Sequence, residues 1–464
     1  MSQALDAIFS AKQVRRDPDG LAQWGTDWTK DRTPNPSAIV FPESNEQVVA
    51  LVQLANREGF ALVPSGGRTG LSGGAVAADA EVVVSFDRLN RILDFSATDR
   101  LLTCQAGVIT QTLQEFAAEQ GLYYPVDFAS AGSSQIGGNV ATNAGGIKVI
   151  RYGLTRDWVA GLRVVTGTGA LLDCNRGLVK NATGYDLRQL FVGSEGTLGC
   201  IVEVDVRLAP APAPQQVMVV GVRAFRDILQ VLNAFQSEVQ LSAFEFFSDL
   251  ALTKVVAHRS LARPLAAETP FYALLEFDQS AGTRAESVFA ALLEDGLVSD
   301  GVLSQSLAQA ADLWQLREGI SESIAPFTPY KNDLSVRISD MPEFLDEVDA
   351  LVQQRYPHFE VCWYGHIGDG NLHLNILKPD GMEVAEFYGH CHGVSGEIFA
   401  LVAKRGGSIS AEHGVGLLKR DFLEYSRGAQ ELQLMAALKQ VFDPNQIMNP
   451  GKLLRESDLA QRSA

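Results

Sequence analysis

Cysteine and histidine are scarce in this chain of 464 residues, which has five of the first and seven of the second. The cysteines are scattered, odd in number and without a CxxC pair; they are Cys104, Cys174, Cys200, Cys362 and Cys391. This pattern excludes a disulfide framework and a metal site made of thiolates. It predicts reduced thiols and a cytoplasmic protein.

The chain also lacks long apolar runs and an excess of positive charge. No uninterrupted hydrophobic stretch approaches the ~20 residues that cross a bilayer, and the beginning of the sequence lacks the apolar core of a signal peptide. The net charge of −17 argues against nucleic acid and anionic membrane surfaces as partners. A local cluster of Arg and Lys can nevertheless bind a small anionic substrate. We therefore expect no nucleic-acid partner and no transmembrane segment.

The length predicts two or three domains, and the order of elements predicts mixed helix and sheet. A strand over Ala38–Phe41, a helix that Ser44 or Asn45 caps and Gly59 ends, and a strand over Ala61–Val63 form an α/β unit. Another helix is expected over Thr110–Glu119. The prolines of LAPAPAPQQ, residues 208–216, indicate a linker, beyond which strands alternate with helices.

Two glycine-rich stretches can hold a ligand with their backbones. PSGGRTGLSGG, residues 64–74, precedes a strand and not a helix, so it is a poor Rossmann fingerprint. Its N–H groups can still form an anion nest, to which Arg68 could add charge; a plain solvent loop explains this stretch equally well. PVDFASAGSSQIGGNVATNAGG, residues 125–146, suits close packing against a large flat ligand. Its expected hydrogen-bonding side chains are Ser133, Ser134, Asn139, Thr142 and Asn143.

Two of the few histidines flank a tight turn in GHIGDGNLHLNI, residues 365–376. Asp369-Gly370 predicts a two-residue hairpin turn, which places His366 opposite His373 on one face. Asn375 points to the same face. With Glu412 from SAEHGVG, the two imidazoles would make the ligand set of an open zinc site. The alternative is a pair of hydrogen-bonded histidines in an ordinary hairpin.

A group of basic residues can hold an anionic substrate. Arg317 and Ser321 are four residues apart on one expected helix face, and Lys331 follows after Pro326 ends that helix. Arg suits bidentate capture of a carboxylate, and Lys suits a point contact. The alternative is a solvated helix face.

Six motifs in order carry a family resemblance: SGGRTGLSGGAV, DFASAGSSQIGGNVATNAGG, GSEGTLG, GHIGDGNLHLNI, SAEHGVG and FDPNQIMNPGK. Over residues 36–454 the chain resembles the FAD-linked 2-hydroxyacid dehydrogenases of the vanillyl-alcohol oxidase superfamily. The resemblance implies an α+β fold with a two-subdomain FAD-binding domain over residues 1–212. It further implies an α+β cap domain over residues 213–420 and a C-terminal helical segment, residues 421–464, that returns to the FAD domain.

The resemblance also implies which residues bind FAD. Pro64, Ser65, Gly66, Gly67, Arg68, Thr69 and Gly70 would hold the pyrophosphate. The rest of the cofactor would contact Gly132, Ser133, Gly137, Gly138, Asn139, Asn143, Gly146, Ile201 and Asn449. Some relatives attach FAD through a histidine of the first loop, where this chain has Arg68. We therefore expect non-covalent FAD.

For the reaction, the resemblance implies a divalent metal, with zinc expected, on His366, His373 and Glu412, and His413 as the base. HGVG can alternatively be a plain turn at a helix start. Arg317, Ser321, Lys331 and Asn375 would bind a dicarboxylate. The expected reaction is oxidation of (R)-2-hydroxyglutarate to 2-oxoglutarate, with hydride transfer to flavin. The expected electron acceptor is electron-transfer flavoprotein. A homodimer is one possible arrangement of the protein. Alternatives are D-lactate, D-malate or glycolate as substrate, a metallohydrolase, or a subunit that only relays electrons.

Overall fold

The structure, a computed structural model, describes residues 2–29 and 32–460 and divides into two compact units. Unit 1 comprises residues 1–145, 154–211 and 412–464, and unit 2 comprises residues 146–153 and 212–411. The passage at residues 211–212 falls within the proline-rich linker. The limits expected from the sequence, 1–212, 213–420 and 421–464, stay a prediction.

Unit 1 begins with the predicted α/β unit. Strand β2 (Ala38–Val40) and strand β3 (Leu62–Ser65) each pair in parallel with β4 (Val82–Ser85), and α3 (Asn45–Glu58) connects β2 to β3. The Ser44 side chain accepts a hydrogen bond from the Gln47 N–H at the start of α3, and Gly59 ends it at φ 72°. A left-handed residue suits glycine because it has no Cβ. The predicted cap and stop are confirmed.

The larger sheet of unit 1 is antiparallel, in the order β5-β6-β10-β8-β9. Its strands are β5 (Ile92–Ser96), β6 (Leu101–Gln105), β8 (Val159–Thr166), β9 (Leu171–Cys174) and β10 (Gly199–Arg207). Helix α4 (Thr110–Glu119) has the predicted bounds. After α16 (Ala429–Phe442), the Leu62–Met448 bridge joins the end of the chain to β3.

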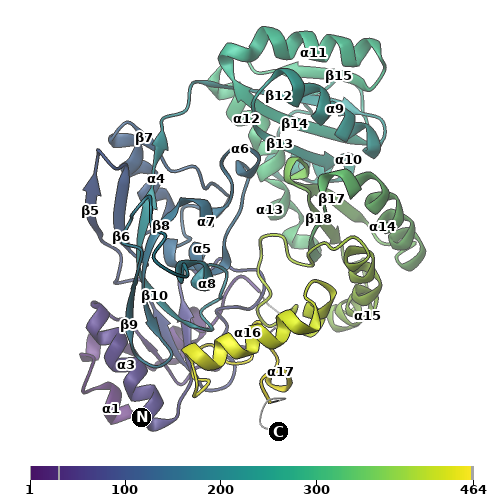
Figure 1. Cartoon of the computed structure of the whole chain (residues 1–464). Helices are drawn as coiled ribbons and strands as arrows, with labels where there is room; N and C mark the ends of the chain where they lie inside the picture. Colours follow the sequence, from purple (N-terminus) through teal and green to yellow (C-terminus); the bar gives the residue numbers. More distant parts are fainter. Residues whose placement is uncertain (1, 30–31, 461–464) are drawn as a thin grey trace. The chain divides into compact units, whose positions relative to one another are not determined.

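Unit 2 is built on a seven-stranded sheet in the order β15-β12-β14-β13-β17-β18-β16, with antiparallel pairing throughout (Figure 1). The strands are β12 (Gln215–Val222), β13 (Leu241–Ser248), β14 (Phe271–Asp278), β15 (Val298–Leu303), β16 (Tyr330–Ser335), β17 (Val361–Gly365) and β18 (Asn371–Ile376). Its longer helices are α9 (Phe225–Glu238), α10 (Asp249–Arg259), α11 (Gly282–Glu294), α12 (Leu307–Glu318), α14 (Met341–Arg355) and α15 (Val384–Ala403).

Two further expectations concern cysteines and membranes. All five cysteines are free and buried, which agrees with the expected reduced thiols. Among the described residues, no helix combines the length and the apolar character that crossing a bilayer requires.

Candidate functional site

The first glycine-rich loop of unit 1 leaves its backbone donors available. Within residues 2–29 and 32–460, none of the N–H groups of residues 66–70 donates a hydrogen bond to the protein. A Cβ on Gly67 would lie 2.0 Å from the carbonyl oxygen of Ser133, so glycine permits the contact between the two glycine-rich loops. Successive unpaired N–H groups form a nest for an anion. The loop therefore fits a phosphate group.

Arg68 is turned toward the protein. It has φ 61°, and its Nη1 donates to the Gly66 carbonyl at 3.0 Å and lies 3.4 Å from Asp87 Oδ1. Its guanidinium carbon also lies 5.6 Å from the centre of the Trp24 ring. A carboxylate beside the guanidinium offsets its charge, so the nest depends mainly on backbone groups.

The second glycine-rich loop leads into α5 (Ile136–Thr142), where two glycines have different surroundings. A Cβ on Gly137 would lie 2.6 Å from the Ala106 Cβ, whereas a Cβ on Gly138 would meet no described atom within 4 Å. The Asn139 amide donates to Thr110 Oγ1 at 2.6 Å. The open space at Gly138 is where a flat ligand can approach the helix.

Most polar side chains of this second loop bond to the protein. Asn143, at φ 50°, accepts a hydrogen bond from the Arg156 N–H at 3.1 Å. Ser134 Oγ lies 2.7 Å from Thr110 Oγ1, and Thr142 Oγ1 donates to the Gly138 carbonyl at 3.1 Å. These side chains shape the loop, and several of its backbone N–H groups, among them those of Ser133, Ser134 and Gly137, also bond within the protein. The open space beside Gly138 is thus what this loop offers to a ligand.

The C-terminal part of unit 1 adds a buried amide near this region. Asn449 is 1% exposed, and its Nδ2 donates to the Gly74 carbonyl at 2.9 Å and to the Glu195 carbonyl at 2.7 Å. Its Oδ1 has no hydrogen-bond partner among the described residues. A buried acceptor without a partner costs free energy, so it points to a missing ligand. Ile201 is buried in β10 beside a register shift.

Glu195 is a buried residue of unit 1 that the sequence reasoning missed. Its two carboxylate oxygens accept hydrogen bonds from the N–H groups of Val415 and Gly416, each at 2.7 Å. Burial raises the pKa of the Glu195 carboxyl, against the lowering effect of those two bonds. The contact holds the backbone that follows His413, and only the motif GSEGTLG around Glu195 could have drawn attention to it.

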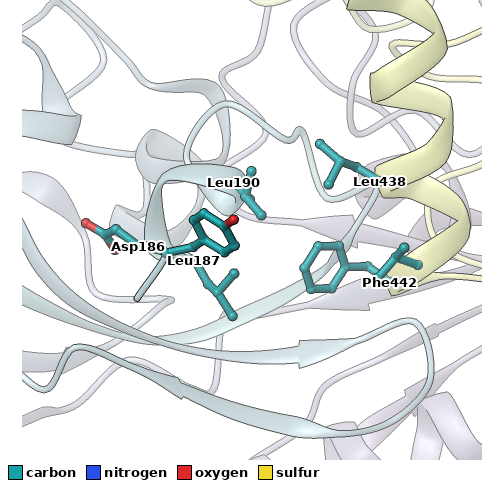
Figure 2. A pocket seen from close by; sticks show the side chains of 7 residues that line it. Asp186, Leu187, Leu190, Leu438 and Phe442 are labelled. Carbon is teal, nitrogen blue, oxygen red and sulfur yellow. The ribbon is translucent and has the colours of Figure 1, made fainter. Parts of the chain in front are cut away.

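A separate apolar hollow lies in unit 1 between the segment before α8 (Arg188–Phe191) and α16 (Figure 2). Leu187, Leu190, Leu438 and Phe442 line it, with Asp186 at its edge. Asp186 is paired with Arg188 at 2.6 Å. Its lining is thus mainly apolar, and its one carboxylate is already paired with an arginine.

In unit 2, β17 and β18 form the predicted hairpin with a different register. His373 pairs with Tyr364, so the predicted pairing of His366 with His373 is wrong. The connection contains a 3-10 turn over Ile367–Asp369 and Gly370 at φ 83°, which makes it longer than the expected two residues. A register difference of two residues keeps each side chain on its face. The two imidazoles therefore still meet, with ring centroids 5.3 Å apart.

Each of these histidines has a buried carboxylate beside it. Glu245 Oε1, on β13, lies 2.8 Å from His366 Nδ1. Asp333 pairs directly with His373 across β16 and β18, and its Oδ1 lies 3.8 Å from His373 Nδ1. Both carboxylates are at most 1% exposed. The sequence reasoning missed both, because each reaches its histidine through pairing between strands that are distant in the sequence.

Residues that can hold a metal ion occur in both units. Asp333 and His373 are partners on neighbouring strands of unit 2, and Glu412 and His413 are adjacent residues of unit 1, with Glu412 Oε1 3.7 Å from His413 Nε2. The segment before Glu412 is fixed to β16, because the Ala411 N–H donates to the Asp333 carbonyl at 3.2 Å. Imidazole nitrogens with carboxylate oxygens are a donor set that suits zinc. His366, an expected ligand, lies beside His373 in unit 2.

Arg317, near the end of α12, is a buried cation of unit 2. It is 5% exposed, and its Nη2 lies 2.8 Å from Glu245 Oε2. Its guanidinium carbon lies 4.8 Å from the centre of the Tyr364 ring. Arg317 Nε has no hydrogen-bond partner among the described residues. Buried donors of this kind fit an anionic ligand.

Lys331 lies on β16 and completes the polar group. Its Nζ donates to Ser321 Oγ at 2.9 Å, and burial lowers the pKa of its ammonium. Asn375 is its direct partner on β18 and has a buried Nδ2 without a partner among the described residues. The helix expected through Arg317 and Ser321 is divided: α12 ends at Glu318, and α13 (Ile320–Ile324) follows Gly319.

Comparisons with known proteins match two parts of the chain to two family models. Residues 36–175 match the family described as FAD binding domain, and residues 211–453 match FAD linked oxidases, C-terminal domain. D-2-hydroxyglutarate dehydrogenase of Stutzerimonas stutzeri (strain A1501) is 58% identical over 97% of this chain and 97% of its own length. Mitochondrial D-2-hydroxyglutarate dehydrogenase of Bos taurus is 37% identical over 97% of this chain and 82% of its own length.

Solved structures show the same fold at low identity. p-Cresol methylhydroxylase is 15% identical, with a TM-score of 0.76, over 98% of this chain and 96% of its own. Alkyldihydroxyacetonephosphate synthase is 19% identical, with a TM-score of 0.72, over 97% of this chain and 84% of its own. The α+β fold expected from the sequence is confirmed.

An FAD-binding domain followed by the C-terminal domain of FAD-linked oxidases defines the class of this protein as a flavin-dependent oxidoreductase. At 58% identity over almost its full length, the chain belongs to the D-2-hydroxyglutarate dehydrogenase family within that class. The expected FAD dependence and family are confirmed.

Proposed function

We propose that the enzyme oxidises (R)-2-hydroxyglutarate to 2-oxoglutarate. The observation that carries the proposal is the buried Arg317 of α12 and the partly buried Lys331 of β16, which belong to the same unit as His366 and His373. Two cations with available donors suit the distal carboxylate of a dicarboxylate. The two imidazoles suit a metal at the hydroxyacid end.

FAD would be held by the backbone of the glycine-rich loops in unit 1. Among the residues that the structure describes, the N–H groups of residues 66–70 and Asn449 Oδ1 have no hydrogen-bond partner, and Gly138 has open space beside it. These observations support this placement. When bound, FAD supplies the two-electron oxidising capacity of the reaction. We propose non-covalent attachment, because Arg68 stands where some relatives carry the linking histidine. Acid denaturation should release all the flavin, and flavin left on the precipitate would contradict this.

A divalent metal, with zinc expected, would be held by His366, His373 and Glu412. A ligating histidine commonly donates its other ring N–H to a carboxylate. Glu245 at 2.8 Å from His366 Nδ1 supports that arrangement, and Asp333 lies near His373 at a longer distance of 3.8 Å. When bound, a metal of this kind stabilises a developing alkoxide and lowers the pKa of a coordinated hydroxyl.

His413 would take the proton of the substrate hydroxyl. The loop that follows His413 is fixed by Glu195, whose carboxylate accepts hydrogen bonds from the N–H groups of Val415 and Gly416. A positioned base within hydrogen-bond reach of the hydroxyl is what this step needs. Asn375 and Ser321 would orient the substrate, since Asn375 has an available Nδ2 and Ser321 already accepts from Lys331.

The deciding experiment is a substrate screen on purified FAD-loaded enzyme with an artificial electron acceptor. (R)-2-Hydroxyglutarate should give a kcat/KM well above those of D-lactate, D-malate and glycolate. A preference for D-lactate would overturn the assignment of the distal-carboxylate group. Electron-transfer flavoprotein as acceptor, a homodimer and a cytoplasmic location are further proposals that this screen leaves for separate tests.

A further inference from the structure

Glu245 stands at the junction of the two halves of the site in unit 2. It lies on β13, which pairs with β17 through Phe246 and Gly365, so it is next to His366, the residue that directly follows β17. One carboxylate oxygen, Oε1, lies 2.8 Å from His366 Nδ1, and the other, Oε2, lies 2.8 Å from Arg317 Nη2. With 1% exposure, this carboxylate depends on those two neighbours for compensation.

We propose that Glu245 is a positioning residue shared by metal binding and substrate recognition. One oxygen orients His366 toward the metal, and the other holds Arg317 and offsets part of its charge. This inference rests on the proposed function and adds a coupling between its two ends.

The contact with His366 concerns the metal. A carboxylate at Nδ1 accepts the ring N–H and so fixes the tautomer in which Nε2 carries the lone pair. Removing such a carboxylate commonly weakens metal affinity by about 10–100-fold. Glutamine at this position keeps the shape but loses the charge that favours this tautomer.

The contact with Arg317 concerns the distal carboxylate. Oε2 and Nη2 are close, yet neither atom has a hydrogen bond of good geometry in the described part of the chain. Arg317 Nε is likewise without a partner there. The guanidinium is thus charge-compensated while its donors remain available to a second anion. Without the charge of Glu245, a buried cation would lack compensation, and a substrate carboxylate would gain by supplying it.

The loss of the Glu245 charge should therefore have opposite effects on the affinity for zinc at His366 and on the affinity for a carboxylate at Arg317. Glu245→Gln should weaken zinc binding, because His366 loses its oriented form. The same change should tighten binding of a distal carboxylate to Arg317. Simple disorder of the site would weaken both, so the sign separates positioning from general structural support.

Asp333 provides a matched control. It lies beside the other histidine and accepts a hydrogen bond from Asn371 Nδ2 at 2.9 Å. Asp333→Asn should weaken zinc binding through His373. It should leave the relative affinity for dicarboxylate and monocarboxylate unchanged, because Arg317 pairs with Glu245.

The experiment uses the full-length FAD-loaded protein and two binding measurements. Zinc affinity is measured by competition with a chromogenic chelator. At saturating zinc, binding of 2-oxoglutarate and of pyruvate is followed through the flavin absorbance; both share the 2-oxoacid end, so their affinity ratio isolates the distal carboxylate. For Glu245→Gln we expect zinc affinity lower by about 10–100-fold and a ratio shifted several-fold toward 2-oxoglutarate. Unchanged zinc affinity, or an unchanged or reversed ratio, would overturn the inference.

A second variant covers a failure of Glu245→Gln to fold. Glu245→Gln combined with Arg317→Met removes both charges and should fold, because no uncompensated cation remains. It should keep the weak zinc binding and lose the preference for 2-oxoglutarate. Failure of this double variant to fold, or wild-type zinc affinity in it, would overturn the inference. Wild-type protein that binds both 2-oxoacids equally, or works fully without metal, would instead contradict the proposed function.

Discussion

The glycine-rich loops of unit 1 and the polar face of the sheet in unit 2 recognise ligands in different ways. In the loops, Asn139, Asn143 and Ser134 bond to the protein, and among the described residues the N–H groups of residues 66–70 are left for a ligand. In unit 2, the side chains of Arg317 on α12 and Asn375 on β18 carry donors that have no partner among the described residues. The first site should therefore be sensitive to an added Cβ, and the second to the loss of a functional group.

The two regions also differ in the free energy that is lost when a polar group has no partner. Backbone donors in a loop need little compensation when water replaces the ligand, because they remain near the surface. The charges of unit 2 are buried and depend on one another, since Glu245 touches both His366 and Arg317. Removing one member of such a group leaves another without compensation. Coupled effects are expected on the sheet, and largely independent effects in the loops.

The largest effect is expected from His413→Ala. Loss of a general base should lower kcat by about 10²–10⁴-fold, while flavin and metal remain bound. Activity, zinc content and the flavin spectrum of the variant check this. His258→Ala, on the exposed side of α10, is the matched control and should behave as wild type. If zinc is lost together with activity, His413 is a ligand, as its place beside the expected ligand Glu412 permits.

The next effect is expected from Arg317→Ala. Truncation of a buried charged contact should remove roughly 2–4 kcal/mol of transition-state stabilisation for the dicarboxylate. D-Lactate, which has no distal carboxylate, should lose much less. The measurement is kcat/KM for both substrates, with Arg226→Ala on the surface of α9 as control. Equal losses on both substrates would reject the assignment of Arg317.

A smaller effect is expected from pH, through Lys331. Burial lowers the pKa of this ammonium below its usual value of 10.5. As pH rises through that lowered pKa the charge is lost, so KM for the dicarboxylate should rise at a lower pH than an exposed lysine would cause. KM for D-lactate should stay flat. Lys331→Arg should remove the pH dependence by keeping the charge, and a wild-type KM that is flat over the alkaline range would contradict the role.

The sequence predicts well what local signals determine. Ser44, Gly59 and the bounds Thr110–Glu119 follow from capping, glycine and helical periodicity, which act within a few residues. The hairpin is predicted in part. The alternation of side chains along a strand places His366 and His373 on one face, but the 3-10 turn changes the pairing register by two residues.

Residues that reach the site through distant pairing could not be predicted. Glu245 meets His366 because β13 pairs with β17, and Asp333 meets His373 because β16 pairs with β18. Neither residue lies in a motif, and strand order is not encoded in local spacing. Glu195 is similar, since its partners Val415 and Gly416 lie about 220 residues further along the chain. The carboxylates of Glu245, Asp333 and Glu195 thus become evident only from long-range contacts, whereas sequence motifs reveal the residues that these carboxylates contact.

The smallest effect, and the sharpest test of the backbone-recognition half of the comparison, is expected from Gly138→Ala. A Cβ there meets no described atom within 4 Å, and Gly138 lies inside α5. Alanine in a helix interior is favoured over glycine by about 0.5–1 kcal/mol, so the apoprotein should become slightly more stable. FAD should bind more weakly if the cofactor occupies that space.

Thermal melting of the apoprotein and FAD titration by flavin fluorescence separate these two results for Gly138→Ala. Gly393→Ala in α15 is the matched control, because its Cβ also meets nothing within 4 Å and it lies in unit 2. The control should gain stability without any change in FAD affinity. If Gly138→Ala binds FAD as tightly as wild type does, the open space beside α5 is not part of the flavin site. Recognition by the backbone would then be confined to the loop over residues 66–70, whose N–H groups the substitution leaves untouched.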